Sequence, residues 1–133
     1  MSEVTGKSGN AKPDRRLFIA SALALLVPAR AFAHHGWRWA EDGQFELTGI
    51  IRSIYLGPPH GLLDVDVEGA MWKVELGPPS RIRGAGLKEG GISEGQEVFA
   101  SGHRSKNRSE NVMKAERITV AGIVYDFYPN RSG

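Results

Sequence analysis

Histidines are the residues in this sequence whose type and position best suit metal chemistry. The chain contains four of them and no cysteine; they are His34, His35, His60 and His103. Without cysteine the chain forms no disulfide and no thiolate metal site, and it has no thiol nucleophile. Neutral imidazole nitrogens are common ligands of Cu(II), Zn(II) and Ni(II). The positions of the histidines along the chain therefore determine whether such a site can form.

The first two histidines follow Ala31-Phe32-Ala33, which has the A-x-A form of an export cleavage site. Cleavage after Ala33 would give His34 a free α-amine beside its own imidazole. These two nitrogens can chelate one ion, and His35 or His60 can supply a third. A nitrogen-only ligand set favours Cu(II), and less strongly Zn(II) or Ni(II). The predicted site is thus a copper-type site with His34, His35 and His60 as ligands; alternatively, the pair is a solvated chain end.

His60 is the remote histidine that best fits this site because of its neighbours in sequence, Gly57-Pro58-Pro59-His60-Gly61. Two prolines stiffen a loop and lower the entropy cost of presenting an imidazole. Alternatively, His60 caps the loop through a backbone hydrogen bond. His103 ends an expected strand, where a half-buried structural histidine is the more common outcome, and we leave it outside the predicted site.

Other polar clusters favour surface roles over catalysis. Asp64, Asp66 and Glu68 could bind a hard cation, but their alternation with apolar residues is more typical of a solvated strand face. Trp37 and Trp39 could form an aromatic platform, although packing onto the domain is the usual outcome. The sequence has no glycine-rich phosphate loop, nucleophile elbow or HExxH motif. We therefore name no catalytic residue, and an enzyme built on a histidine copper centre is only an alternative.

Residues 1–33 have the three-part layout of an export signal. A polar part ends in Arg15-Arg16, an apolar run covers residues 17–27, and the cleavage motif ends at Ala33. The apolar run would form roughly 16 Å of helix, too short for a hydrocarbon core of about 30 Å. The paired arginines resemble a twin-arginine signal, with an ordinary secretory signal as the alternative. We expect a periplasmic or secreted protein with no permanent membrane span.

The basic character of the chain is concentrated in this N-terminal segment. The 133 residues include 17 Lys and Arg and 15 Asp and Glu, and the formal net charge is +2. Five of the basic and two of the acidic residues lie in residues 1–33, so residues 34–133 are close to neutral. Nucleic-acid binding needs a basic face that neutralises phosphates, and we expect no such partner. The length and the 41% hydrophobic content indicate one globular domain, residues 34–133.

This domain has the periodicity of a small all-β fold. Apolar and polar residues alternate over 45–52, 63–67 and 72–76, and further strands are expected at 98–103, 112–120 and 123–127. The alternation places Lys73 and Glu75 on the wet face of their strand. One short helix is expected at about 80–85. This order is that of the OB-fold, a five-stranded Greek-key barrel, with an SH3-like barrel or a β-sandwich as the alternative.

Gly49 lies inside the first strand, where glycine usually marks a bulge or a sharp bend. The residues expected in the core are Phe45, Ile51, Val65, Trp72, Val74 and Val98.

The domain resembles domain-of-unknown-function family 6152, a family of small exported bacterial proteins. The resemblance covers most of residues 33–127 and is carried by Ala33-His34-His35, Leu47-Thr48-Gly49, Pro59-His60, Trp72-Lys73-Val74-Glu75-Leu76-Gly77, Gly95-Gln96-Glu97-Val98 and Gly102. Pro58 stands where members typically have Asn, and Gly36-Trp37 where they have a small polar residue and Phe. The resemblance implies an exported OB-like domain and implies no activity.

Two functions of different classes are therefore compatible with the sequence. The first is a non-enzymatic metal-binding module that holds Cu(II) or Zn(II) through His34, His35 and His60. The second is a structural or adaptor domain that binds a protein, a peptide or a small ligand across its barrel face without a metal.

Overall fold

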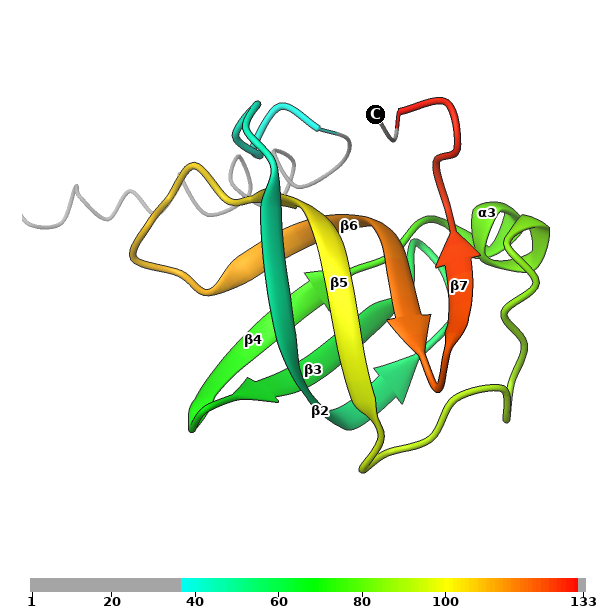
Figure 1. The fold of residues 1–133 in the computed structure, drawn as a ribbon. Coiled ribbons are helices and arrows are strands. Elements are labelled where there is room, and N and C mark those ends of the chain that lie inside the picture. The colour runs from blue at the N-terminus through cyan, green and yellow to red at the C-terminus, as the bar shows by residue number, and fades with distance from the viewer. Residues whose placement is uncertain (1–36, 132–133) are drawn as a thin grey trace, which may run out of the picture. The chain divides into compact units, whose positions relative to one another are not determined.

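The computed structural model describes residues 37–131. These residues contain six strands and one short helix, joined by loops (Figure 1). In chain order they are β2 (Phe45–Tyr55), β3 (Leu62–Val67), β4 (Ala70–Glu75), α3 (Pro79–Gly84), β5 (Glu97–Arg104), β6 (Val112–Val120) and β7 (Ile123–Asp126). Every predicted strand and the predicted helix are present. The expected export signal, His34 and His35 lie outside the described residues. Within those residues, no helix has the length and hydropathy needed to cross a membrane.

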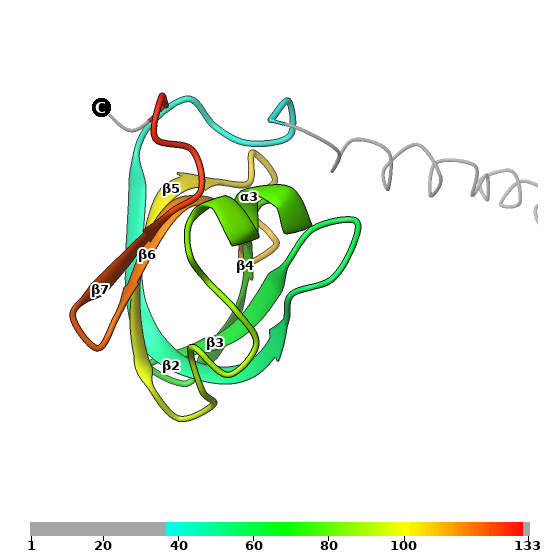
Figure 2. The same ribbon diagram turned by 90° about the vertical axis from the view of Figure 1, so that its right-hand side faces the viewer.

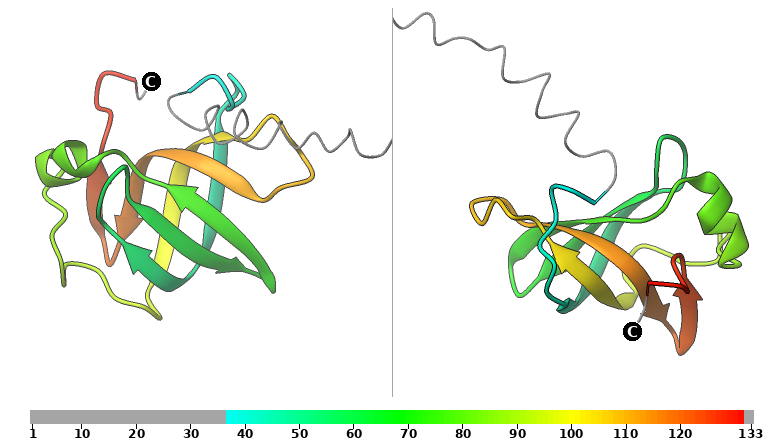
Figure 3. Two further views of the ribbon diagram at one scale, coloured as in Figure 1. Left: turned by 180° about the vertical axis from the view of Figure 1, so that it is seen from behind. Right: turned by 90° about the horizontal axis from the view of Figure 1, so that it is seen from above.

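The strands form a closed barrel with one additional strand. Hydrogen bonds connect them in the order β4-β3-β2-β5-β6-β7, and a parallel pairing of β4 with β6 closes β2 to β6 into a ring. Helix α3 lies between β4 and β5 in the chain (Figure 2). It contributes Ile82 to the core. The prediction of a mainly β, OB-like barrel with one short helix is confirmed. Strand β7 pairs only with β6 and lies outside the ring, as the views in Figure 3 show.

Strand β2 is shared by both halves of the barrel because it bends. Its first part pairs with β5 up to Ile50, and its second part pairs with β3 from Ile50 onward, with a register shift between Ile51 and Ser53. A Cβ on Gly49 would lie 2.5 Å from the carbonyl oxygen of Asp66, so the close approach of β2 to β3 requires glycine. A glycine usually marks a bulge or a bend, and the register irregularity of β2 lies just beyond Gly49, between Ile51 and Ser53.

Five of the six predicted core residues are buried; they are Ile51, Val65, Trp72, Val74 and Val98. The sixth, Phe45, is only half-buried, because it is the first residue of β2 and lies at the rim of the core. Its ring stacks on Trp72 with 5.1 Å between centroids. The guanidinium of Arg104 lies over both rings, 4.7 Å from the Trp72 centroid. A cation over the aromatic faces thus covers this end of the core.

The carboxylates of β3 lie on the outer face, as predicted. Asp64 accepts hydrogen bonds of 2.8 Å from both Lys73 and Ser53, and these bonds lower the pKa of Asp64, with Lys73 the larger cause. Asp66 forms an ion pair of 3.5 Å with Arg52. These carboxylates therefore pair with cations of neighbouring strands instead of converging on one point.

Candidate metal-site histidine and its buried partners

His60 lies in the loop between β2 and β3, and this loop is anchored next to the histidine. The Gly61 N–H donates to the Gly77 carbonyl at 3.0 Å, and the Leu76 N–H donates to the Gly61 carbonyl at 2.9 Å. A Cβ on Gly61 would lie 2.7 Å from Cδ1 of Ile82 and 3.1 Å from the Tyr55 carbonyl oxygen, so the loop packs closely against α3 at this point. The backbone that carries His60 is therefore held against the barrel, which limits the positions that the imidazole can occupy.

The imidazole of His60 faces a buried carboxylate. Its Nε2 lies 3.6 Å from Oε2 of Glu75, and its side chain is 21% exposed while that of Glu75 is 6% exposed. The other oxygen of Glu75 accepts a hydrogen bond of 3.0 Å from Nζ of Lys114, whose side chain is 3% exposed. The three side chains form a row from the protein surface to its interior, called here the His60–Glu75–Lys114 row.

Barrel closure brings Glu75 and Lys114 together. Glu75 of β4 and Lys114 of β6 are direct partners in the parallel pairing that closes the ring. Lys114 also lies 5.8 Å from the ring centroid of Tyr128, a residue that follows β7. The prediction that Glu75 faces solvent is wrong, because β6 and the segment after β7 enclose the end of β4. Sequence periodicity holds no signal for this burial, since the partners of Glu75 are far away along the chain.

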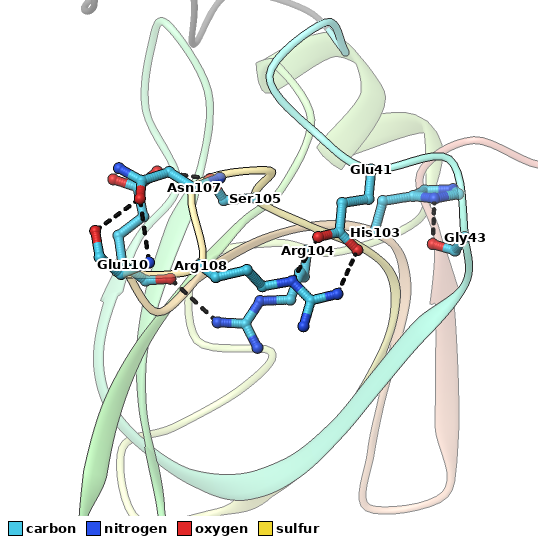
Figure 4. Close-up of polar contacts among 9 residues, drawn as sticks. Glu41, Gly43, His103, Arg104, Ser105, Asn107, Arg108 and Glu110 are labelled. Atoms are coloured by element: carbon cyan, nitrogen blue, oxygen red, sulfur yellow. Dashed lines mark hydrogen bonds and ion pairs between the residues drawn. The ribbon is translucent and has the colours of Figure 1, made fainter.

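His103 is a structural residue, as predicted, although it is buried and not half-buried. Its Nδ1 donates to the Gly43 carbonyl at 2.9 Å, and its Nε2 lies 2.8 Å from Oε2 of Glu116 (Figure 4 shows the first contact). A carbonyl oxygen only accepts, so Nδ1 carries a proton, and a further proton lies between Nε2 and the carboxyl group. Gln44 also donates to Glu116, at 3.4 Å. His103 thus connects the residues before β2 to strands β5 and β6.

Side chains of the loop between β5 and β6 form ion pairs and hydrogen bonds within the domain. Arg108 donates to both oxygens of Glu41, at 2.6 and 3.0 Å (Figure 4). This pairing lowers the pKa of Glu41 and raises that of Arg108. Ser105 donates to Glu110 inside the same loop at 2.7 Å. Because Arg108 is largely exposed, its ion pair contributes little to stability.

The structure describes one of the three predicted metal ligands, His60. The other two, His34 and His35, lie outside the described residues. Within residues 37–131, no group of three or more His, Asp or Glu side chains is arranged to hold a metal ion. Trp39 is buried, so the prediction that it packs onto the domain is confirmed.

Strands β5, β6 and β7 carry exposed apolar side chains. Three apolar side chains are largely exposed there, Phe99 at 39%, Ile123 at 54% and Val124 at 56%. Phe99 and Val124 flank Thr119 in one cross-strand row. A shallow cavity of about 350 Å³ adjoins this row and is lined by Gln96, Glu97, Phe99, Thr119, Ala121 and Gly122. These strands present a partly apolar outer face.

No protein-family model and no curated protein matches the chain. Among solved structures, the S. pombe Stn1–Ten1 complex is 20% identical with a TM-score of 0.48, over 58% of this chain and 57% of that one. The ZRD-deleted mutant of TiaS with agmatine is 15% identical with a TM-score of 0.46, over 60% and 21%. A complex of TiaS with a transfer RNA and ATP has the same identity and TM-score, over 60% and 18%. This chain spans less than two thirds of each, and similarities this low carry no information on function.

Proposed function

We propose that this chain is an exported, non-enzymatic metal-binding domain with a copper-type site. The ligands are the α-amine and imidazole of His34, the imidazole of His60 and, as a further ligand, His35. One observation carries the proposal: the anchored His60 ring has its Nε2 beside the buried carboxylate of Glu75. Metal-binding histidines commonly have this arrangement, in which one ring nitrogen faces a carboxylate and the other binds the metal.

The remaining ligands come from the residues before the barrel. Residues 37–131 supply no second histidine near His60, because His103 is buried against Glu116. The pair His34-His35 follows a predicted cleavage motif, and cleavage there would add an amine nitrogen to the set. Amine and imidazole nitrogens together favour Cu(II), with Zn(II) as the weaker alternative.

The proposal is tested by calorimetric titration of Cu(II) into protein that begins at His34. One tight site is expected, and a glycine added before His34 should weaken it because the α-amine is then displaced. His60→Ala should lower the affinity more than about 100-fold, since loss of an outer partner of a ligand alone costs about 10–100-fold.

His103→Gln is the matched control, because it removes an imidazole outside the site and retains a group that can donate and accept. It should leave the Cu(II) affinity unchanged. Equal affinities for the native protein and for His60→Ala would contradict the proposal.

A second candidate function is the binding of an extended peptide along β7. The Phe127 N–H donates to the Glu116 carbonyl at 2.8 Å, and bonded and unbonded pairs alternate along an antiparallel ladder. The backbone groups of Val124 and Asp126 therefore point away from β6, toward the open edge of the sheet. With the exposed side chains of Ile123 and Val124 beside it, this edge suits a peptide strand with apolar residues.

Val124→Pro tests this second candidate, because it removes an outward N–H without removing a bond between β6 and β7. Peptides selected against the folded native protein from a displayed library should bind this variant at least tenfold more weakly, measured by fluorescence anisotropy. Arg83→Ala, on the exposed side of α3, should bind them normally. If the selected peptides bind Val124→Pro as well as the native protein, β7 is not their site.

A further inference from the structure

Strand β7 is an edge of the sheet, and its outward backbone groups belong to Val124 and Asp126. Within residues 37–131, β7 pairs only with β6. The Phe127 N–H donates to β6, and alternation along the ladder turns the N–H and C=O groups of Val124 and Asp126 away from it. A strand added at this edge would therefore form its hydrogen bonds with these two residues.

The side chains at this edge match a second copy of the same strand. On the outer face, Phe99, Thr119 and Val124 form one cross-strand row, in which Phe99 is 39% and Val124 56% exposed. If two β7 strands pair antiparallel about a two-fold axis at Val124, this side chain lies opposite the partner's Val124. The rows of both copies then join into one continuous, largely apolar row. On the other face of β7, Ile123, which is 54% exposed, lies opposite the partner's Tyr125.

The two ends of β7 differ in charge. Helix α3 lies beside its C-terminal end, where Arg81 donates to the Phe127 carbonyl at 3.3 Å (Figure 1). Both Arg81 and Arg83 of this helix are exposed. At the other end, the turn before β7 adjoins the exposed Glu97, which lines the same shallow cavity as Ala121 and Gly122. One end of the strand is thus basic and the other acidic.

An antiparallel pair brings these opposite ends together. With the axis at Val124, Asp126 lies opposite the partner's Gly122, so the partner's turn reaches the end of β7 that adjoins α3. A cavity of about 400 Å³ lies at this end, lined by Ser80, Arg81, Gly84, Asp126, Phe127 and Pro129. Asp126 itself forms an ion pair of 3.5 Å with Arg117. The partner's Glu97 would therefore approach the positive charge of α3, which is a favourable arrangement.

We propose that β7 pairs with the β7 of a second copy of this chain, antiparallel about a two-fold axis at Val124, to form a homodimer with one extended sheet. Each contact occurs twice in such a pair, and the pairing closes because both edges are then occupied. This inference rests on the second candidate function, the binding of a strand along β7, and it names that strand.

Sedimentation velocity over a series of protein concentrations tests the dimer, on the protein that begins at His34. Native protein should convert from monomer to dimer as its concentration rises. Val124→Lys places like charges opposite each other at the axis and should stay monomeric, and so should Val124→Glu. An equimolar mixture of these two variants should form a dimer again, because opposite charges then meet at the axis.

Two controls accompany the variants. Because Val124 is exposed, both of its variants should keep the native circular dichroism spectrum. Met71→Lys changes an apolar side chain of similar exposure, 51%, on β4, and it should dimerise like the native protein.

The outcomes separate this inference from the second candidate function. If native protein stays monomeric up to its solubility limit, the inference is overturned, while selected peptides that bind Val124→Pro weakly would still support strand binding at β7. A dimer that persists in Val124→Lys, or a mixture of the charged variants that stays monomeric, would also overturn it, because Val124 would then lie away from the axis. If the native dimer and the mixed dimer form but no selected peptide binds, the homodimer stands and peptide binding fails.

Discussion

Lys114→Met is expected to lower the free energy of unfolding by about 3–5 kcal/mol, because it leaves the buried carboxylate of Glu75 without its cation. Glu75 and Lys114 are joined at 3.0 Å, and their side chains are 6% and 3% exposed. Water cannot replace the lost ammonium group at that depth. His60 faces the other carboxylate oxygen from 3.6 Å and compensates only in part. Urea unfolding followed by tryptophan fluorescence measures the loss as a lower midpoint with an unchanged slope.

The matched control is the double variant Glu75→Met/Lys114→Met, which removes both charges and keeps similar side-chain volumes. Replacement of a whole buried ion pair by apolar residues is often neutral or stabilising. The double variant should therefore be more stable than Lys114→Met alone. A double variant that is as unstable as the single one would show that Lys114 stabilises the barrel through packing and not through its charge.

Gly102→Ala is expected to cost more than about 4 kcal/mol, a loss that places it among the most damaging single substitutions. A Cβ at this position would lie 2.0 Å from the carbonyl oxygen of Lys114 and 2.9 Å from Cα of Ala115. Both are backbone atoms of β6, so no side chain can rotate to make room. The register of β5 against β6 also shifts between Ser101 and Gly102. Relief of the clash would require separation of the two strands at this bulge.

Gly84→Ala serves as the control for this prediction. Gly84 ends helix α3 and has open space around the position of a Cβ. Alanine should be tolerated there, with a change within about 1 kcal/mol. Thermal and urea unfolding of both variants should show a large loss for Gly102→Ala and little change for Gly84→Ala. Native-like stability of Gly102→Ala would mean that β5 and β6 are farther apart than the structure has them.

The two predictions concern one feature of the fold, the placement of β6. Gly102 lets β5 approach the backbone of Lys114, and the side chain of Lys114 extends to Glu75 on β4. The same strand therefore closes the barrel and holds Lys114 against Glu75, the carboxylate that lies beside His60. A variant that moves β6 should affect His60 even though His60 lies on a different loop.

Much of the fold could be predicted from the sequence because its signals are local. Alternation of apolar and polar residues, together with the turns between them, located each strand to within a few residues. Gly49 indicated an irregular part of β2, and it lies where β2 approaches the backbone of Asp66 too closely for a Cβ. The order of the elements, with one helix after the hairpin, then favoured the OB-like barrel.

The same reasoning failed at Glu75 for a physical reason. Because Glu75 alternates with Trp72 and Val74, periodicity assigns it to the outer face of β4. An outer-face residue is exposed only if solvent covers that face, and at the end of β4 it does not. The parallel pairing of β4 with β6 and the segment after β7 cover the end of the strand. Such long-range contacts leave no periodic trace in the sequence of either strand.

The sequence alone therefore located the strands and the helix and favoured an OB-like barrel, since these signals come from side chains near one another along the chain. The tertiary structure decided which polar residues meet inside. It joined His60, Glu75 and Lys114 into one row and paired His103 with Glu116. Those contacts connect strands and loops far apart in sequence, and they arise only when closure of the barrel removes the groups from water.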